Sequence, residues 1–166
     1  MIDLMFDLMT DRFHPLIVKT LTWPDEVATQ AFAHNMAARP ALSHAMLELR
    51  GDLGAGKTTF VRHLLKALGV TGRIKSPTYA VVEPYTLDDL NIWHFDFYRF
   101  NDPNEWEEAG FRDIFASTGL KLVEWPDKAG RHLPQADLII AIEVMADDAR
   151  ALTLSALTTT GEALLA

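Results

Sequence analysis

The stretch RGDLGAGKTTFVRHLLKAL, residues 50–68, decides how the rest of the chain is interpreted. Its residues from Gly51 to Thr58 match G-x-x-x-x-G-K-T, a pattern in which a glycine-rich backbone wraps around phosphate groups. Glycine permits the tight, positive-φ turns that such a wrap requires, and the start of the following helix attracts an anion. Lys57 is expected to supply a mobile positive charge, and the Thr58 hydroxyl is expected to ligate Mg²⁺.

The residues on either side of this loop supply the context that a phosphate site requires. Residues 45–49 (AMLEL) predict a short strand before the loop. A helix is predicted after it, because apolar side chains recur at core-facing spacing and a glycine then ends the pattern: Phe60, Leu64, Leu65, Leu68 and Gly69. The order strand, loop, helix favours a phosphate site over the alternative interpretation, an ordinary glycine-rich turn.

Length and composition limit the class of protein. A chain of 166 residues with 49% hydrophobic and 23% charged residues is typical of one globular domain, which we place at residues 16–166. It has no cysteine, so disulfides and thiolate metal sites are excluded and a reducing cytoplasm is compatible. Residues 1–15 carry acids and no early positive charge, so we expect a poorly ordered extension and not a secretory signal.

The charge and the hydropathy pattern limit the partners. The formal net charge is −8, whereas a free-standing nucleic-acid binder usually shows a basic surface. We therefore expect no binding to DNA, and any link to nucleic acid is expected to run through a protein partner. No apolar run approaches the roughly 20 residues of a membrane span, so no membrane association is expected.

Strand and helix patterns alternate along the chain, which predicts an α/β fold. Thr22 is the expected cap of the first helix, Pro84 is expected to close a strand, and a short tail is expected from Gly161. Strands are predicted at residues 16–21, 45–49, 78–85, 91–98, 120–125, 138–145 and 151–157, and helices at residues 22–36, 58–68, 101–109 and 111–115, with a helix or turn at 126–131. We expect a P-loop NTPase-like sandwich with flanking helices, its mixed sheet mostly parallel around the strand before the loop and antiparallel at an edge.

Two acids are candidates for the metal side of the site. Asp96 lies among apolar and aromatic residues in IWHFDFYR, and Glu124 ends the strand LKLVE. Ligands gather at the carboxyl ends of strands in open α/β sheets. The alternative is that each acid only pairs with a basic residue such as Arg99 or Lys75. The residue after Asp96 is Phe97, so the adjacent glutamate base of many fast ATPases is missing. Either slow intrinsic hydrolysis or a water-positioning group supplied elsewhere is expected.

Three further positions carry two interpretations each. The hydroxyls of Ser76 and Thr78 would sense a γ-phosphate or Mg²⁺, or would only cap the start of a strand. His94 faces the same side of its strand as Asp96 and would tune that acid or bind metal, or would be a satisfied core histidine. Trp125 would stack on a base or would pack on its own loop.

Four motifs in this order and spacing are more specific than any one of them: GDLGAGKTTF from Gly51, KSPTY from Lys75, HFDFYR from His94 and LVEWP from Leu122. Together they resemble the bacterial TsaE (YjeE) family, the small ATPase of tRNA threonylcarbamoyladenosine synthesis. The resemblance covers nearly the whole chain from about residue 20 onward.

The resemblance implies a cytoplasmic protein that binds ATP and Mg²⁺ and joins the TsaD–TsaB complex. That complex transfers a threonylcarbamoyl group to the adenosine next to the anticodon of tRNAs reading codons that start with A. The ATPase would be weak alone and stimulated by its partners, and tRNA would be met only through the complex.

The resemblance also implies residue roles. Lys57, Asp96 and Glu124 would be catalytic, with Thr58, Glu124 and Asp96 around the metal. The nucleotide would be bound by residues of the loop, the switch and three flanking positions: Gly51, Gly54, Ala55, Gly56, Lys57, Thr58, Thr59, Ser76, Thr78, Trp125, Glu26 and Arg150.

Two other functions remain as alternatives. One is a P-loop kinase that phosphorylates a small molecule, although no arginine-dense lid lies between Glu105 and Arg131. The other is a nucleotide-sensing module without hydrolysis. A GTPase is disfavoured because the guanine-reading pattern N-K-x-D is missing.

Overall fold

The computed structural model describes residues 14–166 of the chain. The expected poorly ordered segment at residues 1–15 therefore lies almost entirely outside the described residues. Within the described part, no helix combines the length and the apolar character needed to cross a bilayer.

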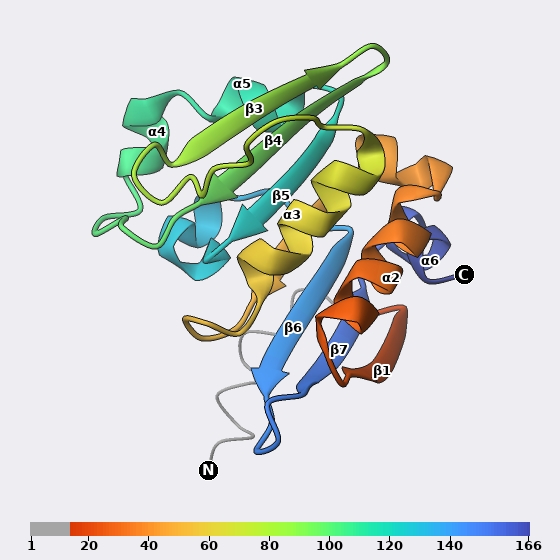
Figure 1. The fold of residues 1–166 in the computed structure, drawn as a ribbon. Coiled ribbons are helices and arrows are strands. Elements are labelled where there is room, and N and C mark those ends of the chain that lie inside the picture. The colour runs from red at the N-terminus through yellow and green to blue at the C-terminus, as the bar shows by residue number, and fades with distance from the viewer. Residues whose placement is uncertain (1–13) are drawn as a thin grey trace.

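Seven strands form one mixed sheet in the order β1-β7-β6-β2-β5-β4-β3 (Figure 1). Strand β2 pairs in parallel with β5 and β6, and β4 pairs in parallel with β5. The β1–β7, β6–β7 and β3–β4 pairs are antiparallel. The predicted α/β fold with a parallel centre and antiparallel edge strands is confirmed, and antiparallel pairs occur at both edges of the sheet. The strands are β1 (Ile17–Trp23), β2 (Met46–Arg50), β3 (Val82–Leu87), β4 (Leu90–Asp96), β5 (Leu120–Glu124), β6 (Leu138–Val144) and β7 (Arg150–Ala156).

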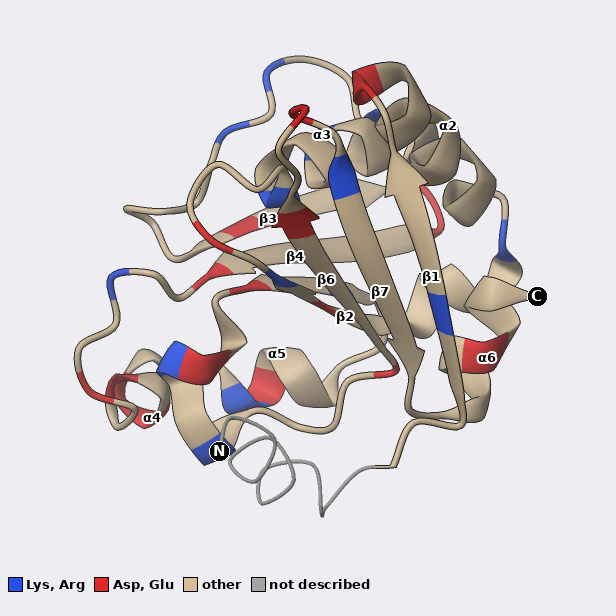
Figure 2. Cartoon of the chain, turned by 90° about the horizontal axis from the view of Figure 1, so that it is seen from below, with Lys and Arg blue, Asp and Glu red and all other residues tan. Residues whose placement is uncertain are grey.

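Helices cover both faces of the sheet. Figure 2 shows α2 and α3 on one side of the strands and α4 and α5 on the other. The α-helices are α2 (Glu26–Ala37), α3 (Lys57–Leu68), α4 (Glu105–Ala109), α5 (Arg112–Ala116) and α6 (Thr159–Leu165), and the 3₁₀ segments are η1 (Pro40–His44) and η2 (Pro126–His132).

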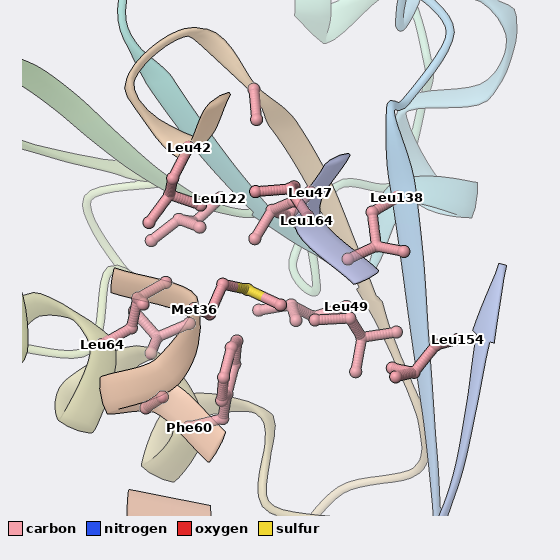
Figure 3. Close-up of a cluster of buried hydrophobic side chains, with 14 of the residues drawn as sticks. Met36, Leu42, Leu47, Leu49, Phe60, Leu64, Leu122, Leu138, Leu154 and Leu164 are labelled. Carbon is pink, nitrogen blue, oxygen red and sulfur yellow. The ribbon is translucent and has the colours of Figure 1, made fainter. Parts of the chain in front are cut away.

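Each face of the sheet carries its own hydrophobic core. On the α3 side, Phe60 and Met36 pack against Leu47 and Leu49 of β2 and their neighbours (Figure 3). The other side is aromatic and includes Phe95, Phe97, Trp106 and Phe111.

The alternation of side chains along β4 and β5 determines which residues can meet α3. Ile92 of β4 belongs to the α3-side core and Phe95 to the aromatic core. His94 and Asp96 therefore point toward α3. On β5, Leu122 belongs to the α3-side core, so Glu124 points the same way.

The predicted cap of α2 was wrong. Thr22 lies inside β1, where it pairs with Ala151 of β7. The cap is Asp25, whose Oδ1 accepts a hydrogen bond from the Ala28 N–H at 2.9 Å. Both residue types cap helices well, and the strand pairing of Thr22 decides between them.

Strands β3 and β4 form an antiparallel hairpin, and β3 begins later than the strand predicted at residues 78–85. Val81 has a left-handed φ of 70° and its N–H bonds to the Pro77 carbonyl, so residues 78–81 form a turn. Pro84 does not end β3 but lies inside it. That position is tolerated because β3 is an edge strand, where a missing N–H breaks no internal ladder.

The C-terminal residues form helix α6 and not a short tail. Thr158 caps it, accepting a hydrogen bond from the Gly161 N–H at 3.1 Å. Leu164 and Leu165 are buried in the α3-side core. A Cβ on Gly161 would overlap the Asp137 carbonyl oxygen and lie 2.8 Å from the carbonyl carbon, so this helix needs glycine to approach the sheet.

We predict that Gly161→Ala lowers the free energy of unfolding by roughly 1–3 kcal/mol, because the backbone of Asp137 must move to admit the methyl group. Urea unfolding followed by circular dichroism measures the change. Ala163→Gln is the matched control, since Ala163 is exposed on the same helix and its replacement should stay within about 0.5 kcal/mol. Equal stability of Gly161→Ala and the unmodified chain would contradict the packing described.

Candidate functional site

The candidate site lies at the carboxyl edge of three parallel neighbours, β2, β5 and β4. Their register places Leu49 opposite Glu124, and Glu124 opposite Asp96. Strand β2 leads through residues 51–56 into α3, so the helix begins above this row of residues. A helix N-terminus and two acids therefore meet at one edge of the sheet. Glu124 was predicted at the end of its strand, whereas Asp96 was predicted inside a strand reaching residue 98, and β4 ends at Asp96 instead.

The loop between β2 and α3 depends on glycine at two positions. Gly51 has φ 150°, and a Cβ there would lie 2.5 Å from the Ile142 carbonyl oxygen of β6. Gly56 has φ 109° and precedes α3 without a side-chain cap. The first N–H groups of α3 thus lack a protein side-chain acceptor at the helix cap, which is the arrangement that binds phosphate.

Lys57 lies back along this loop. Its ammonium donates hydrogen bonds to the Gly51 carbonyl and, at 3.0 Å, to the Asp52 carbonyl. The Nζ atom is 4.4 Å from the ring centroid of Trp125. Lys57 is buried, and this burial lowers the pKa of its ammonium, while the charges of Glu124 and Asp96 act in the opposite direction.

Thr58 and Glu124 are in direct contact. The Thr58 hydroxyl lies 2.9 Å from Oε1 and 3.2 Å from Oε2 of the Glu124 carboxylate. His94 of β4 approaches the same carboxylate, with Nε2 2.7 Å from Oε2. Glu124 is only 2% exposed, so its contact with His94 is buried, while its contact with Thr58 is part-buried.

Asp96 is the second buried acid. Its Oδ1 accepts from the Tyr98 N–H at 2.9 Å, and its Oδ2 accepts from the Thr78 hydroxyl at 3.1 Å. Burial raises the pKa of the Asp96 carboxyl, and the nearby charge of Glu124 adds to the effect. Across residues 14–166, no lysine or arginine forms an ion pair with Asp96 or Glu124, so the alternative of simple pairing with Arg99 or Lys75 is not what the structure shows. The Arg99 guanidinium instead lies 4.1 Å from the centroid of the Tyr79 ring.

The segment predicted as a switch reaches the site through one residue. Ser76 and Thr78 hydroxyls lie 2.9 Å apart, and Thr78 continues the chain of hydrogen bonds to Asp96. Pro77 between them is buried, whereas Tyr79 beyond them is 83% exposed. The segment therefore connects the surface to a buried acid.

Trp125 and Arg150 flank the loop on separate elements. Trp125 has left-handed backbone angles of 55° and 51°, and its ring centroid is 5.0 Å from that of Tyr98. With Lys57 also beside it, the ring faces the site and does not only pack on its own loop. Arg150, the first residue of β7, donates from Nε to the Ala55 carbonyl at 2.9 Å. Thr59 lies in the first turn of α3.

Within residues 14–166, Glu26 makes its side-chain contact on α3 and not with the loop or the two acids. Its carboxylate is 2.9 Å from Nε2 of His63 on α3, and its side chain is 70% exposed. The contact joins α2 to α3.

Thr58, Glu124 and Asp96 suit a magnesium ion that is also bound by phosphates and water. They do not form a site in which protein side chains alone hold a metal. Within the described residues, no three His, Asp or Glu side chains gather closely enough to hold a metal. Mg²⁺ is usually bound by one or two carboxylates together with substrate phosphates and water. A hydroxyl, a carboxylate and a second acid beside a phosphate-binding loop match that requirement.

The contacts of two residues at the site, His94 and Arg50, were not predicted. His94 was paired in the sequence with Asp96, because both share a strand face, but its hydrogen bond goes to Glu124 of the next strand. Arg50, directly before the loop, bridges Glu48 at 2.8 Å and Asp127 at 3.0 Å. The His94–Glu124 and Arg50–Asp127 contacts depend on which elements are neighbours, and residue spacing carries no such information. Glu48 and Arg50 lie two positions apart on one face of β2, so their contact is local.

Comparison with known proteins identifies relatives over most of the chain. Residues 23–152 match the family model described as "Threonylcarbamoyl adenosine biosynthesis protein TsaE". The chain is 42% identical over 143 residues to the tRNA threonylcarbamoyladenosine biosynthesis protein TsaE of Haemophilus influenzae, covering 84% of this chain and 90% of that protein. It is 38% identical to the protein of the same name from Bacillus subtilis, with 84% and 87% covered.

A solved structure is similar as well. The crystal structure of Bacillus subtilis YdiB superimposes with a TM-score of 0.71 at 34% identity, covering 90% of this chain and 93% of that one. Residues 23–152, which the family model matches, span the loop, both acids and the segment between them, and on this agreement of sequence and fold the chain belongs to the TsaE family.

Proposed function

We propose that this chain binds ATP with Mg²⁺ at the edge of β2, β5 and β4 and hydrolyses it slowly, as a subunit required for threonylcarbamoyl modification of tRNA. The observation that carries the proposal is the contact of Thr58 with Glu124 at the start of α3. A hydroxyl on the first turn of the helix and a buried carboxylate at the end of β5 are thereby poised around one point, next to a phosphate-binding loop.

Different residues of the site would bind the phosphates and the metal ion of the nucleotide. The loop N–H groups and the N-terminus of α3 would bind the phosphates. Lys57 would exchange its hydrogen bonds to the Gly51 and Asp52 carbonyls for phosphate oxygens. Thr58 and Glu124 would hold Mg²⁺, with Asp96 beside them. When bound, the ion would neutralise charge on the β- and γ-phosphate oxygens.

Slow hydrolysis is expected because Phe97, directly after Asp96, occupies the position of the glutamate base of many fast ATPases. Phe97 is fully buried in the aromatic core on the opposite face of the sheet. It can neither accept a proton nor reach the site. Catalysis would therefore rest on the positioned charges, and a residue that orients water would have to come from elsewhere.

The proposed role in tRNA modification rests on the names of the relatives and on the net charge of the chain. The relatives carry the name tRNA threonylcarbamoyladenosine biosynthesis protein. We propose that this chain acts in the cytoplasm with the TsaD–TsaB complex and meets tRNA only through it, in line with its net charge of −8. Exposed Tyr79 adjoins Thr78, which bonds to Asp96, so a protein that docks on this segment would act directly on the site.

Glu124→Ala is expected to reduce Mg²⁺-dependent ATP hydrolysis at least about 100-fold while the chain still binds ATP in EDTA, because the metal side is lost and the phosphate loop remains. Phosphate release and calorimetric binding measure the two quantities. Glu143→Ala, an exposed acid on β6, is the control and should behave as the unmodified chain. Normal hydrolysis by Glu124→Ala in the presence of partners would show that the metal assignment is wrong.

The cellular role predicts that purified TsaD and TsaB raise the ATPase rate at least about tenfold, since partner proteins can supply missing catalytic groups to P-loop enzymes. The assay follows ATP hydrolysis and modified adenosine in tRNA together, with Lys57→Ala as the inactive control. Two results would contradict the proposal. ATP use matched one-to-one by a phosphorylated small molecule without partners would indicate a kinase, and tight ATP binding without hydrolysis beside both partners would indicate a sensing module.

A further inference from the structure

His94 is a fully buried histidine with a single polar contact. It lies on β4 with 0% of its surface exposed, facing α3 in the same row as Asp96. Its Nε2 atom is 2.7 Å from Oε2 of Glu124. The other ring nitrogen, Nδ1, is buried without a hydrogen-bond partner in the part of the chain that the structure describes.

This contact determines which nitrogen carries the proton. A carboxylate only accepts hydrogen bonds, so the short approach to Oε2 requires a proton on Nε2. An imidazole with the proton on Nδ1 would set two lone pairs against each other at 2.7 Å. His94 therefore donates to Glu124.

The unpartnered Nδ1 distinguishes this histidine from a satisfied core residue. A buried polar atom without a partner is unfavourable, and an apolar side chain in the same place would avoid that cost. Ile92, two positions earlier on the same face, is such a side chain and is equally buried. Within residues 14–166, the one hydrogen bond that His94 makes is to Glu124. We therefore look for the role of His94 in its effect on the Glu124 carboxylate.

The two oxygens of Glu124 are held differently. Oε2 lies between His94 at 2.7 Å and the Thr58 hydroxyl at 3.2 Å, while Oε1 is contacted by Thr58 alone, at 2.9 Å. We propose that His94 is a positioning residue, which fixes Oε2 of Glu124 so that Oε1 stays on the Thr58 side, where the carboxylate would hold the metal. The inference rests on the proposed Mg²⁺–ATP function and assigns a residue that orients the ligand without touching the metal, as partners of metal ligands commonly do.

The first test detects the hydrogen bond from His94 to Glu124 in the absence of nucleotide. Nitrogen-15 spectra of the full chain at neutral pH should show the His94 ring with a proton on Nε2, the signal being assigned by its loss in His94→Gln. The Nε2 shift should move in Glu124→Gln, which replaces the accepting carboxylate. An unprotonated Nε2, or a shift that ignores Glu124→Gln, would overturn the inference.

The second test separates positioning from packing. ATP binding is measured in EDTA and over a range of Mg²⁺ concentrations for three variants. His94→Leu removes the donor, His94→Gln returns an amide N–H near the position of Nε2, and Ile92→Ala disturbs the same face of β4 without touching Glu124. Unfolding curves of all three show how far packing alone is affected.

We expect His94→Leu to raise, by about 10–100-fold, the Mg²⁺ concentration at which the effect of Mg²⁺ on ATP binding is half-maximal. The ATP affinity in EDTA should be unchanged. His94→Gln should recover most of the response, and Ile92→Ala should keep it despite lower stability. An unaltered Mg²⁺ response in His94→Leu would overturn this inference alone. Failure of the unmodified chain to bind ATP, with or without Mg²⁺, would overturn the proposed function and the inference with it.

Discussion

The buried carboxylate of Glu124 is the group around which this structure is arranged. A carboxylate that is 2% exposed is unfavourable unless donors surround it, and its donors come from two other elements, Thr58 of α3 and His94 of β4. Those elements are adjacent to β5 only because β2, β5 and β4 run in parallel and in one register. The contact therefore links the phosphate loop, the sheet and the second acid in a single network.

The two cores hold this network from opposite faces. On one face, Phe60 and Leu64 anchor α3 against β2, so the first turn of the helix cannot slide along the sheet edge. On the other face, Phe95 of β4 and Phe97, directly after the strand, pack in the aromatic core. Such tightly packed interiors transmit small displacements, so a substitution in either core can move Glu124 relative to Thr58.

The features of this arrangement that depend on local residue types and spacing could be predicted from the sequence. The loop from Gly51, the helix after it and the acids at strand ends follow from residue type and spacing, and side-chain alternation placed His94 and Asp96 on one face. The partner of His94 could not be predicted, because it depends on the register of β4 against β5. Helix α6 was missed because a short tail was expected from Gly161, whereas the close approach of the helix to Asp137 requires this glycine. Glu26 was assigned from family resemblance, and the structure joins it to His63.

Locating the metal tests the central claim most directly. Mn²⁺ can stand in for Mg²⁺ with ATP, and its unpaired electrons remove the NMR signals of residues near it. We predict that the signals of Thr58, Asp96 and Glu124 disappear, while those of Asp88 and Asp89 persist, because that exposed acidic pair lies at the opposite end of β4. Loss of the Asp88 and Asp89 signals with Thr58 and Glu124 unaffected would contradict it.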